Sequence, residues 1–214
     1  MATPPALSTD GYEMQFATNH LGHALLIHRL LPTLQRTTTE HASGTAATGR
    51  IAILSSVGYA LHPCKGGGVD FATLNTVQDT GLFGSWFRYG QSKLANTLYA
   101  QELATRLAET RVTCVAVHPG IVATGLVEEL PWVKRAFVYV GTLGKVAAVE
   151  DGVRNTVWAA TVAREGLVNG GFDVGVGELG KLDTAARDSG DQSGTESLAA
   201  RLWRWTERAI DEWA

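Results

Sequence analysis

Residues 50–56 read RIAILSS, and every position from Ile51 to Leu54 is apolar. A short run of this kind is typical of a parallel β-strand that is covered by helices on both faces. Residues 111–117, RVTCVAV, repeat the pattern, and residues 171–175 indicate a last, shorter strand. These three segments predict a small parallel sheet.

Helical patterns alternate with these strands. Asp10, followed three residues later by Glu13, marks a capped helix start, and this helix is expected to end near Leu31 because Pro32 follows. Three further helices are predicted at residues 89–108, 150–162 and 198–213. Alternating helices and strands are typical of an α/β fold whose parallel strands are joined by right-handed crossovers.

The composition excludes several classes of protein. The 214 residues include 18 Lys+Arg and 21 Asp+Glu, a net charge of −3, which argues against electrostatic binding to nucleic acid. Two cysteines cannot form a disulfide framework, and no zinc-type spacing is present. Residues 1–5, MATPP, lack the features of a signal peptide, and no run approaches a membrane helix in length. We therefore expect a cytoplasmic protein without a transmembrane segment.

A tyrosine and a lysine stand one helical turn apart in the predicted helix at residues 89–108. The sequence there reads YGQSK, which places the Tyr89 phenol and the Lys93 ammonium on one face. An ammonium beside a phenol favours the phenolate and lowers the phenol pKa. The pair is therefore suited to general acid/base chemistry on an alcohol or a carbonyl.

Other polar groups are expected at the same place in the fold. Ser55 and Ser56 end one strand, and residues 119–124, PGIVAT, follow the next. The carboxyl ends of parallel strands face the ligand crevice in open α/β sheets. Asn19 lies inside an otherwise apolar helix, where its amide needs a partner or a function. These features predict a site at the carboxyl edge of the sheet.

Three other signals are interpreted structurally. The histidines at 20, 23 and 28 lack the spacing of a metal motif and are expected to pack or to cap. Residues 66–68, GGG, do not join a strand to a helix and indicate a flexible loop rather than a phosphate cradle. The amphipathic helix at the C-terminus is expected to pack on the body of the protein or on a second subunit, so a homo-oligomer remains an alternative.

Together these motifs resemble the short-chain dehydrogenase/reductase family, and above all its retinol-dehydrogenase-like branch, which is common among fungal oxidoreductases. The resemblance rests on NHLGH at residues 19–23, the serines at 55 and 56, YGQSKLAN at residues 89–96, and PGIVAT at residues 119–124. It implies the C-terminal part of a Rossmann-type doubly wound parallel sheet, with about three strands and flanking helices. Residues 1–180 would form this partial oxidoreductase domain, and residues 181–214 a polar loop and the amphipathic helix.

The resemblance also implies roles for individual residues. Tyr89 would be the general acid/base, Lys93 would lower its pKa, Ser56 would bind the substrate oxygen, and Asn19 would anchor a water in the proton relay. The nicotinamide end of an NADP or NAD cofactor would contact Tyr89, Lys93, Pro119, Gly120, Val122 and Thr124.

The implied reaction is hydride transfer between nicotinamide and an alcohol or ketone. Apolar residues in an insertion at residues 126–140, among them Trp132, Phe137, Val138 and Tyr139, would form a lid over an apolar small molecule of fungal-type secondary metabolism.

The family pattern is incomplete in this sequence. Family members open with a strand and a Gly-rich phosphate loop, and a later strand ends in Asn-Ala-Gly, whereas residues 1–5 are similar to the segment that follows Asn-Ala-Gly. We therefore expect the cofactor-binding N-terminal half to be absent and NAD(P)(H) to bind weakly. A non-catalytic remnant, an interaction module and a fragment of a longer gene remain alternatives. We also expect the strand at residues 50–56 to be an open edge that promotes association or aggregation.

Overall fold

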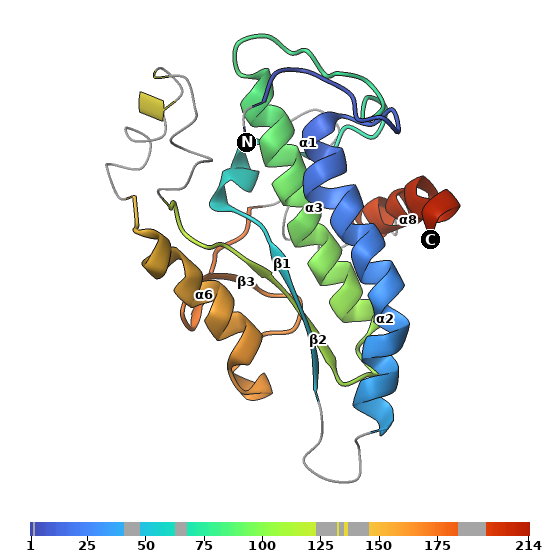
Figure 1. The fold of residues 1–214 in the computed structure, drawn as a ribbon, viewed down its shortest axis with the longest axis vertical. Helices are drawn as coiled ribbons and strands as arrows, with labels where there is room; N and C mark the ends of the chain where they lie inside the picture. The colour runs from blue at the N-terminus through green and yellow to red at the C-terminus, as the bar shows by residue number, and fades with distance from the viewer. Residues whose placement is uncertain are drawn as a thin grey trace.

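The computed structural model describes residues 1, 3–40, 48–62, 68–122, 132, 135–136, 146–183 and 196–214. Its sheet has the order β1–β2–β3–β4 (Figure 1), with strands β1 (Gly49–Leu54), β2 (Val112–Val117), β3 (Phe172–Gly175) and β4 (Glu178–Leu179). The first three strands are parallel, as predicted, and β4 pairs antiparallel to β3. Sequence analysis missed β4 because two residues are too few to show a periodic pattern.

Strand β1 is the edge of the described sheet. It pairs with β2 in register, from Gly49 opposite Val112 to Leu54 opposite Val117, and with no other described strand. All six residues of β2 are buried, as expected of a central parallel strand. The predicted open edge at β1 is therefore confirmed for the residues that the structure describes.

The first helical segment differs from its predicted bounds at both ends. It starts with α1 (Met14–Phe16), passes through one π-helical stretch, η1 (Ala17–Leu21), and continues as α2 (Gly22–Glu40). Its start is capped by Glu13, whose carboxylate accepts a hydrogen bond from the Phe16 amide at 2.7 Å, and not by Asp10. The helix continues past Pro32. The proline removes one backbone hydrogen bond, but residues beyond it, such as Leu34, pack on the core and stabilise the helix.

Helix α3 (Gly84–Arg106) is the centre of the molecule. It begins five residues before its predicted start at Tyr89, because residues 84–88 lack the leucine spacing on which that prediction depended. Seventeen of its residues are buried, since it lies between the sheet, the first helical segment and the C-terminal helix (Figure 1). A helix buried on nearly every side is apolar or internally hydrogen-bonded all round.

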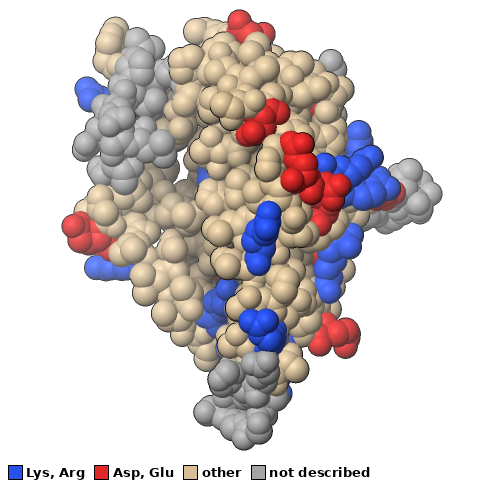
Figure 2. Space-filling view, turned by 45° about the vertical axis from the view of Figure 1, so that its right-hand side comes forward, with Lys and Arg blue, Asp and Glu red and all other residues tan. Residues whose placement is uncertain are grey.

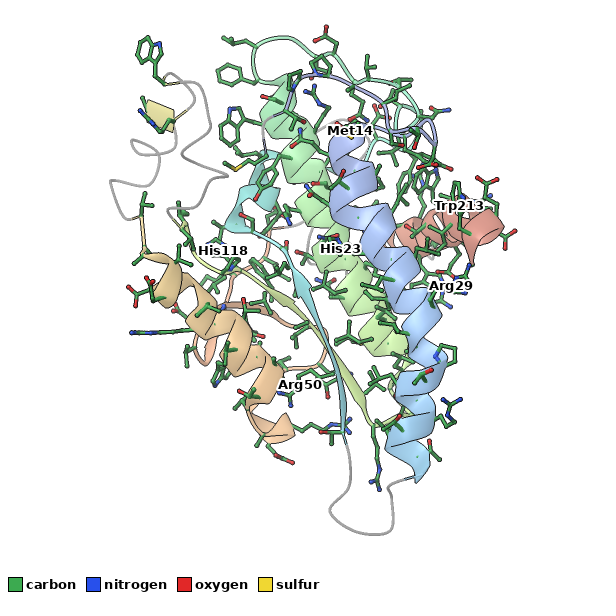
Figure 3. All side chains as sticks on the ribbon, viewed as in Figure 1. Met14, His23, Arg29, Arg50, His118 and Trp213 are labelled. Carbon is green, nitrogen blue, oxygen red and sulfur yellow. The ribbon has the colours of Figure 1, made fainter. Side chains whose placement is uncertain are left out.

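The remaining helices cover the two faces of the sheet. Helix α6 (Val149–Thr161) lies on one face, opposite α2 and α3. Helix α8 (Leu198–Ile210) packs on α3, and Arg29 of α2 donates to the carbonyl of Trp213 beyond its end (Figure 3). Short 3₁₀ turns complete the structure: η2 (Val57–Leu61), η4 (Arg164–Gly166) and η5 (Asp211–Trp213), the last of which replaces the predicted end of the C-terminal helix.

The surface carries mixed charges. On the face drawn in Figure 2, the described basic and acidic side chains lie interspersed and form no broad basic patch. None of the described helices has the length and the apolar composition that crossing a membrane requires.

Candidate active site

The two serines at the end of β1 have different surroundings. The buried Ser55 hydroxyl donates to the carbonyl of Lys93 at 2.7 Å and lies 2.9 Å from the Thr97 hydroxyl, so it joins β1 to α3. The Ser56 hydroxyl accepts the Gly58 amide at 3.0 Å and caps η2. Of the two, Ser56 is the serine that reaches Tyr89.

Tyr89 lies on α3, buried, beside Ser56 at the end of β1. A Cβ placed on Gly58 would stand 3.0 Å from the Tyr89 ring and 3.3 Å from the Ser56 hydroxyl, so a glycine at this position keeps room for both. Burial raises the pKa of Tyr89, and the Ser56 hydrogen bond opposes that rise. The predicted lowering of this pKa is therefore wrong for the structure as it stands.

Lys93 follows Tyr89 by one helical turn on α3. Its ammonium donates to the carbonyl of Leu54 at 3.0 Å and lies 6.0 Å from the centre of the Tyr89 ring. The charge is therefore directed to the end of β1 rather than to the phenol oxygen. Burial lowers the pKa of Lys93 to about 8, because desolvation disfavours the ammonium.

Asn19 lies in the π-helical stretch, where one turn is widened. Its side-chain amide donates to the Ser92 hydroxyl at 2.9 Å. Its carbonyl accepts the side-chain amide of Asn96 at 2.9 Å and lies 3.0 Å from Nδ1 of His23. Single π-helical turns are frequent at functional sites, because they release a backbone group from the helical ladder. Sequence analysis assigned no role to Ser92 or Asn96, although both lie within the quoted YGQSKLAN motif.

The residues that follow β2 border the other side of the candidate site. His118 follows the strand (Figure 3), buried, and burial lowers its pKa to about 4. Gly120 has a φ of +86°, and a Cβ placed there would meet no atom of the described residues within 4 Å. Val122 forms a bridge with Ala147, and its side chain packs against α6 at Gly152. Thr124 and the lid residues Phe137, Val138 and Tyr139 lie outside the described residues, whereas Trp132 is exposed.

A glycine pattern with fingerprint spacing occurs away from these strand ends. Residues 175–180 read GVGELG, but they comprise the end of β3, a two-residue turn, β4 and the residue after it. A dinucleotide fingerprint must lead from a strand into a helix, whose N-terminus then binds the pyrophosphate. The turn at residues 175–180 therefore builds no phosphate site.

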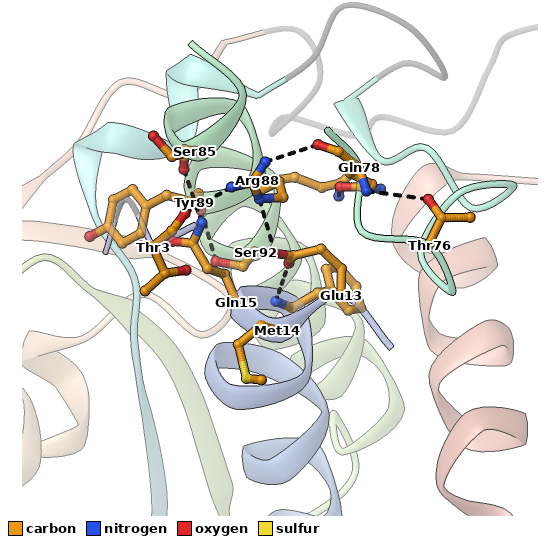
Figure 4. Close-up of polar contacts among 12 residues, drawn as sticks. Thr3, Glu13, Met14, Gln15, Thr76, Gln78, Ser85, Arg88, Tyr89 and Ser92 are labelled. Carbon is orange, nitrogen blue, oxygen red and sulfur yellow. Dashed lines mark hydrogen bonds and ion pairs between the residues drawn. The ribbon is translucent and has the colours of Figure 1, made fainter. Parts of the chain in front are cut away.

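A buried charged pair anchors the helix just before Tyr89 (Figure 4). Arg88 lies 3.2 Å from the Glu13 carboxylate, and both side chains are almost fully buried. The guanidinium also donates to the carbonyls of Gln78 at 2.9 Å and Thr3 at 2.8 Å. Burial raises the pKa of Glu13, although hydrogen bonds and Arg88 oppose the rise. The pair joins the N-terminal segment, α1 and the loop before α3 to the helix that carries Tyr89.

The arrangement suits proton transfer at an alcohol or carbonyl and the binding of a hydroxylated ligand. The Tyr89 phenol ring and the Ser56 hydroxyl both border Gly58 at the carboxyl end of β1. Lys93 has three N–H donors and uses one on Leu54, and a Cβ placed on Gly120 would meet no atom of the described residues within 4 Å. These observations fit the nicotinamide and ribose end of a dinucleotide.

Comparison with known proteins finds relatives whose names describe dehydrogenases. No family model matches the chain. The chain is 33% identical, over 98% of its length, to the short-chain dehydrogenase/reductase drtF of Aspergillus calidoustus, of which it spans 65%. It is 42% identical to human retinol dehydrogenase 14 over 58% of its length, which is 32% of that protein. The chain therefore spans less than two thirds of these curated relatives.

A solved structure agrees in fold. An uncharacterised protein from Mycobacterium paratuberculosis superposes with a TM-score of 0.66 and 28% identity. The superposition covers 99% of this chain and 63% of the other.

Proposed function

Homology places this chain in the short-chain dehydrogenase/reductase family, and on that premise we propose that its site performs the proton transfer of an NAD(P)-dependent oxidoreductase. The reaction is hydride transfer between nicotinamide and an alcohol or carbonyl carbon. The observation that carries the proposal is that Tyr89 and Ser56 both border Gly58 at the carboxyl end of β1, one helical turn from Lys93.

Tyr89 and Ser56 handle the oxygen of the substrate in this proposal. During reduction the phenol donates its proton to the carbonyl oxygen, and during oxidation it takes the proton back. The Ser56 hydroxyl, which lies beside Tyr89 at Gly58, orients the same oxygen. Burial raises the pKa of Tyr89 and so favours the protonated phenol.

Lys93 and Asn19 support this proton transfer. The Lys93 ammonium has donors left for the ribose hydroxyls of the cofactor, and Asn19 anchors the water of the relay behind it. A bound NAD or NADP supplies the hydride donor or acceptor. Beside Tyr89 and Lys93, the proposed nicotinamide end consists of Pro119, Gly120, Val122 and Thr124.

We further propose that the substrate is an apolar alcohol, aldehyde or ketone. The relatives include retinol dehydrogenases, and retinol is an apolar alcohol. They also include a fungal short-chain dehydrogenase/reductase, and a substrate of fungal-type secondary metabolism is part of this proposal.

Replacing the phenol hydroxyl tests the proposal. Tyr89→Phe should lower the rate of NAD(P)H-dependent reduction of an apolar aldehyde by about 10²–10⁴-fold, because the proton donor is lost. The matched control is Tyr99→Phe in the same helix, where the ring is buried against Trp203, and it should retain the rate. Cofactor oxidation followed by absorbance measures both variants.

A second readout does not depend on turnover. Burial raises the pKa of the Tyr12, Tyr89 and Tyr99 phenols, and spectroscopic titration should show that Tyr89→Phe removes one of these three while the other two remain. Equal rates for the wild type and Tyr89→Phe would exclude Tyr89 as the acid.

A further inference from the structure

We propose that His20 is a positioning residue of the site, although it contacts neither Tyr89 nor Lys93. As a neutral imidazole with its hydrogen on Nδ1, it fixes the side-chain amide of Asn96. Asn96 in turn holds two backbone carbonyls at the site. The effect on turnover rests on the proposed function, whereas the geometry of the bridge does not.

The orientation of Asn96 follows from its neighbours. One end of its amide lies 2.9 Å from the carbonyl oxygen of Asn19 and 2.9 Å from that of Leu54. Carbonyl oxygens only accept hydrogen bonds, so this end must be the NH₂ group with its two donors. The Asn96 oxygen therefore faces Nδ1 of His20, at 3.2 Å.

The tautomer of His20 follows from that orientation. An amide oxygen only accepts, so Nδ1 of His20 must carry the hydrogen. In the neutral ring, Nε2 then has a free lone pair, and it accepts the Thr206 hydroxyl of α8 at 2.9 Å. His20, Asn96 and Thr206 are all buried, and the pKa of His20 is lowered to about 4 by burial, which keeps the ring neutral.

Packing holds the ring in this position. The rings of Phe16 and Tyr99 pack edge-to-face against the imidazole of His20, with ring centroids 5.0 Å and 5.3 Å away. The imidazole therefore cannot turn away without disturbing the core, and the hydrogen bonds join four elements: α8, η1, α3 and β1.

The bridge ends at a carbonyl that Lys93 also uses. The carbonyl oxygen of Leu54 accepts both the Asn96 amide and the Lys93 ammonium, at 2.9 Å and 3.0 Å. The carbonyl of Asn19, which Asn96 also holds, belongs to the residue whose side chain contacts Ser92. By fixing Asn96, His20 holds the Leu54 carbonyl that accepts the Lys93 ammonium. Through the same amide it also holds the widened helical turn at Asn19 in place.

Two substitutions separate positioning from packing. In His20→Asn, the shorter amide donates from about the place of Nδ1, so it can still fix Asn96 but does not reach Thr206. In His20→Gln, the longer amide reaches Thr206 from about the place of Nε2 but leaves Asn96 without its donor. Both variants lose the same ring.

We expect His20→Asn to retain the kcat and His20→Gln to lose about ten- to a hundredfold in kcat, with little change in KM. Hydrogen exchange at the Asn96 side-chain amide should remain slow in His20→Asn and become fast in His20→Gln. Long-range proton–nitrogen NMR correlations of the wild-type chain should show the His20 hydrogen on Nδ1.

The opposite order of the two variants would overturn the proposal, because it would show that the contact to α8 is what matters. A wild-type hydrogen on Nε2 would also overturn it, and that measurement does not require either variant to fold. A wild-type chain without turnover would refute the proposed function alone, since the tautomer and the amide exchange still decide the bridge.

Discussion

The two faces of the sheet are built very differently. On the α3 face, side chains from β1, β2 and β3 join α2, α3 and α8 in one large core. On the α6 face, the buried core consists of Val115, Val117 and Ala159. Helix α6 also leaves the valines at 149, 153 and 157 half-exposed along one side. The candidate site is positioned from the α3 face, so the face that stabilises the chain is also the face that places Tyr89 and Lys93.

The largest expected effect is a difference in stability between matched leucines. Leu98→Ala on the α3 face should lower the free energy of unfolding by about 3–4 kcal/mol, because its side chain is fully buried in the large core. Leu167→Ala, beside the small core of the α6 face, should lower it by about 1 kcal/mol, since this side chain is only partly buried. Urea unfolding of both variants measures the difference. Equal losses would show that the two faces contribute alike.

The pH dependence of stability should also differ between the faces. His20, in the core of the α3 face, has its pKa lowered from 6.5 to about 4. Between these values the unfolded chain binds a proton that the folded chain does not. The stability contributed by neutral His20 is therefore complete above pH 6.5 and is lost as the pH falls toward 4, on the order of 3 kcal/mol. His118 adds a loss of the same sign.

Asp173 contributes a pH dependence of stability with the opposite sign. Its backbone carbonyl accepts a hydrogen bond from the side-chain amide of Asn155 on α6. Burial raises its pKa from 3.8 to about 6, so the folded chain holds the proton more tightly, and the stability contributed by the protonated group is lost as the pH rises through 6. Asp173→Asn should therefore be more stable than the wild type at pH 7, by about 1–2 kcal/mol, and lose that advantage near pH 4. Urea unfolding at both pH values measures this. An advantage that grows toward low pH would contradict the assignment.

The smallest effect on stability should accompany a change in association. Val153→Ser and Val157→Ser on α6 should each change the free energy of unfolding by less than about 0.5 kcal/mol, because both side chains are half-exposed. Together they should reduce self-association, since they remove apolar surface. Light scattering after size-exclusion chromatography measures the mass. Leu26→Ser on α2, also half-exposed, is the control and should leave association unchanged. A reduction in the control alone would place the associating surface on α2.

The sequence by itself determined the order of the main elements and the spacing of the candidate site residues. Strands β1 and β2 are visible as runs of apolar residues, and Tyr89 and Lys93 share a helix face at a spacing of four. Ser55 and Ser56 both follow from their place at a strand end, and the choice of Ser56 rests on the family resemblance. These features are encoded within a few neighbouring residues, and local periodicity is sufficient to find them.

Other features were decided by the tertiary structure alone. The pKa of Tyr89 is raised because burial outweighs its hydrogen bond, and burial depends on what packs around α3. Arg88 forms an ion pair with Glu13, which lies before α1. His20 forms a hydrogen bond with Thr206, 186 residues away in the sequence. Desolvation and buried hydrogen bonds depend on groups far apart in the chain, so no local pattern announces them. The positions of these groups are known only once the chain has folded around α3.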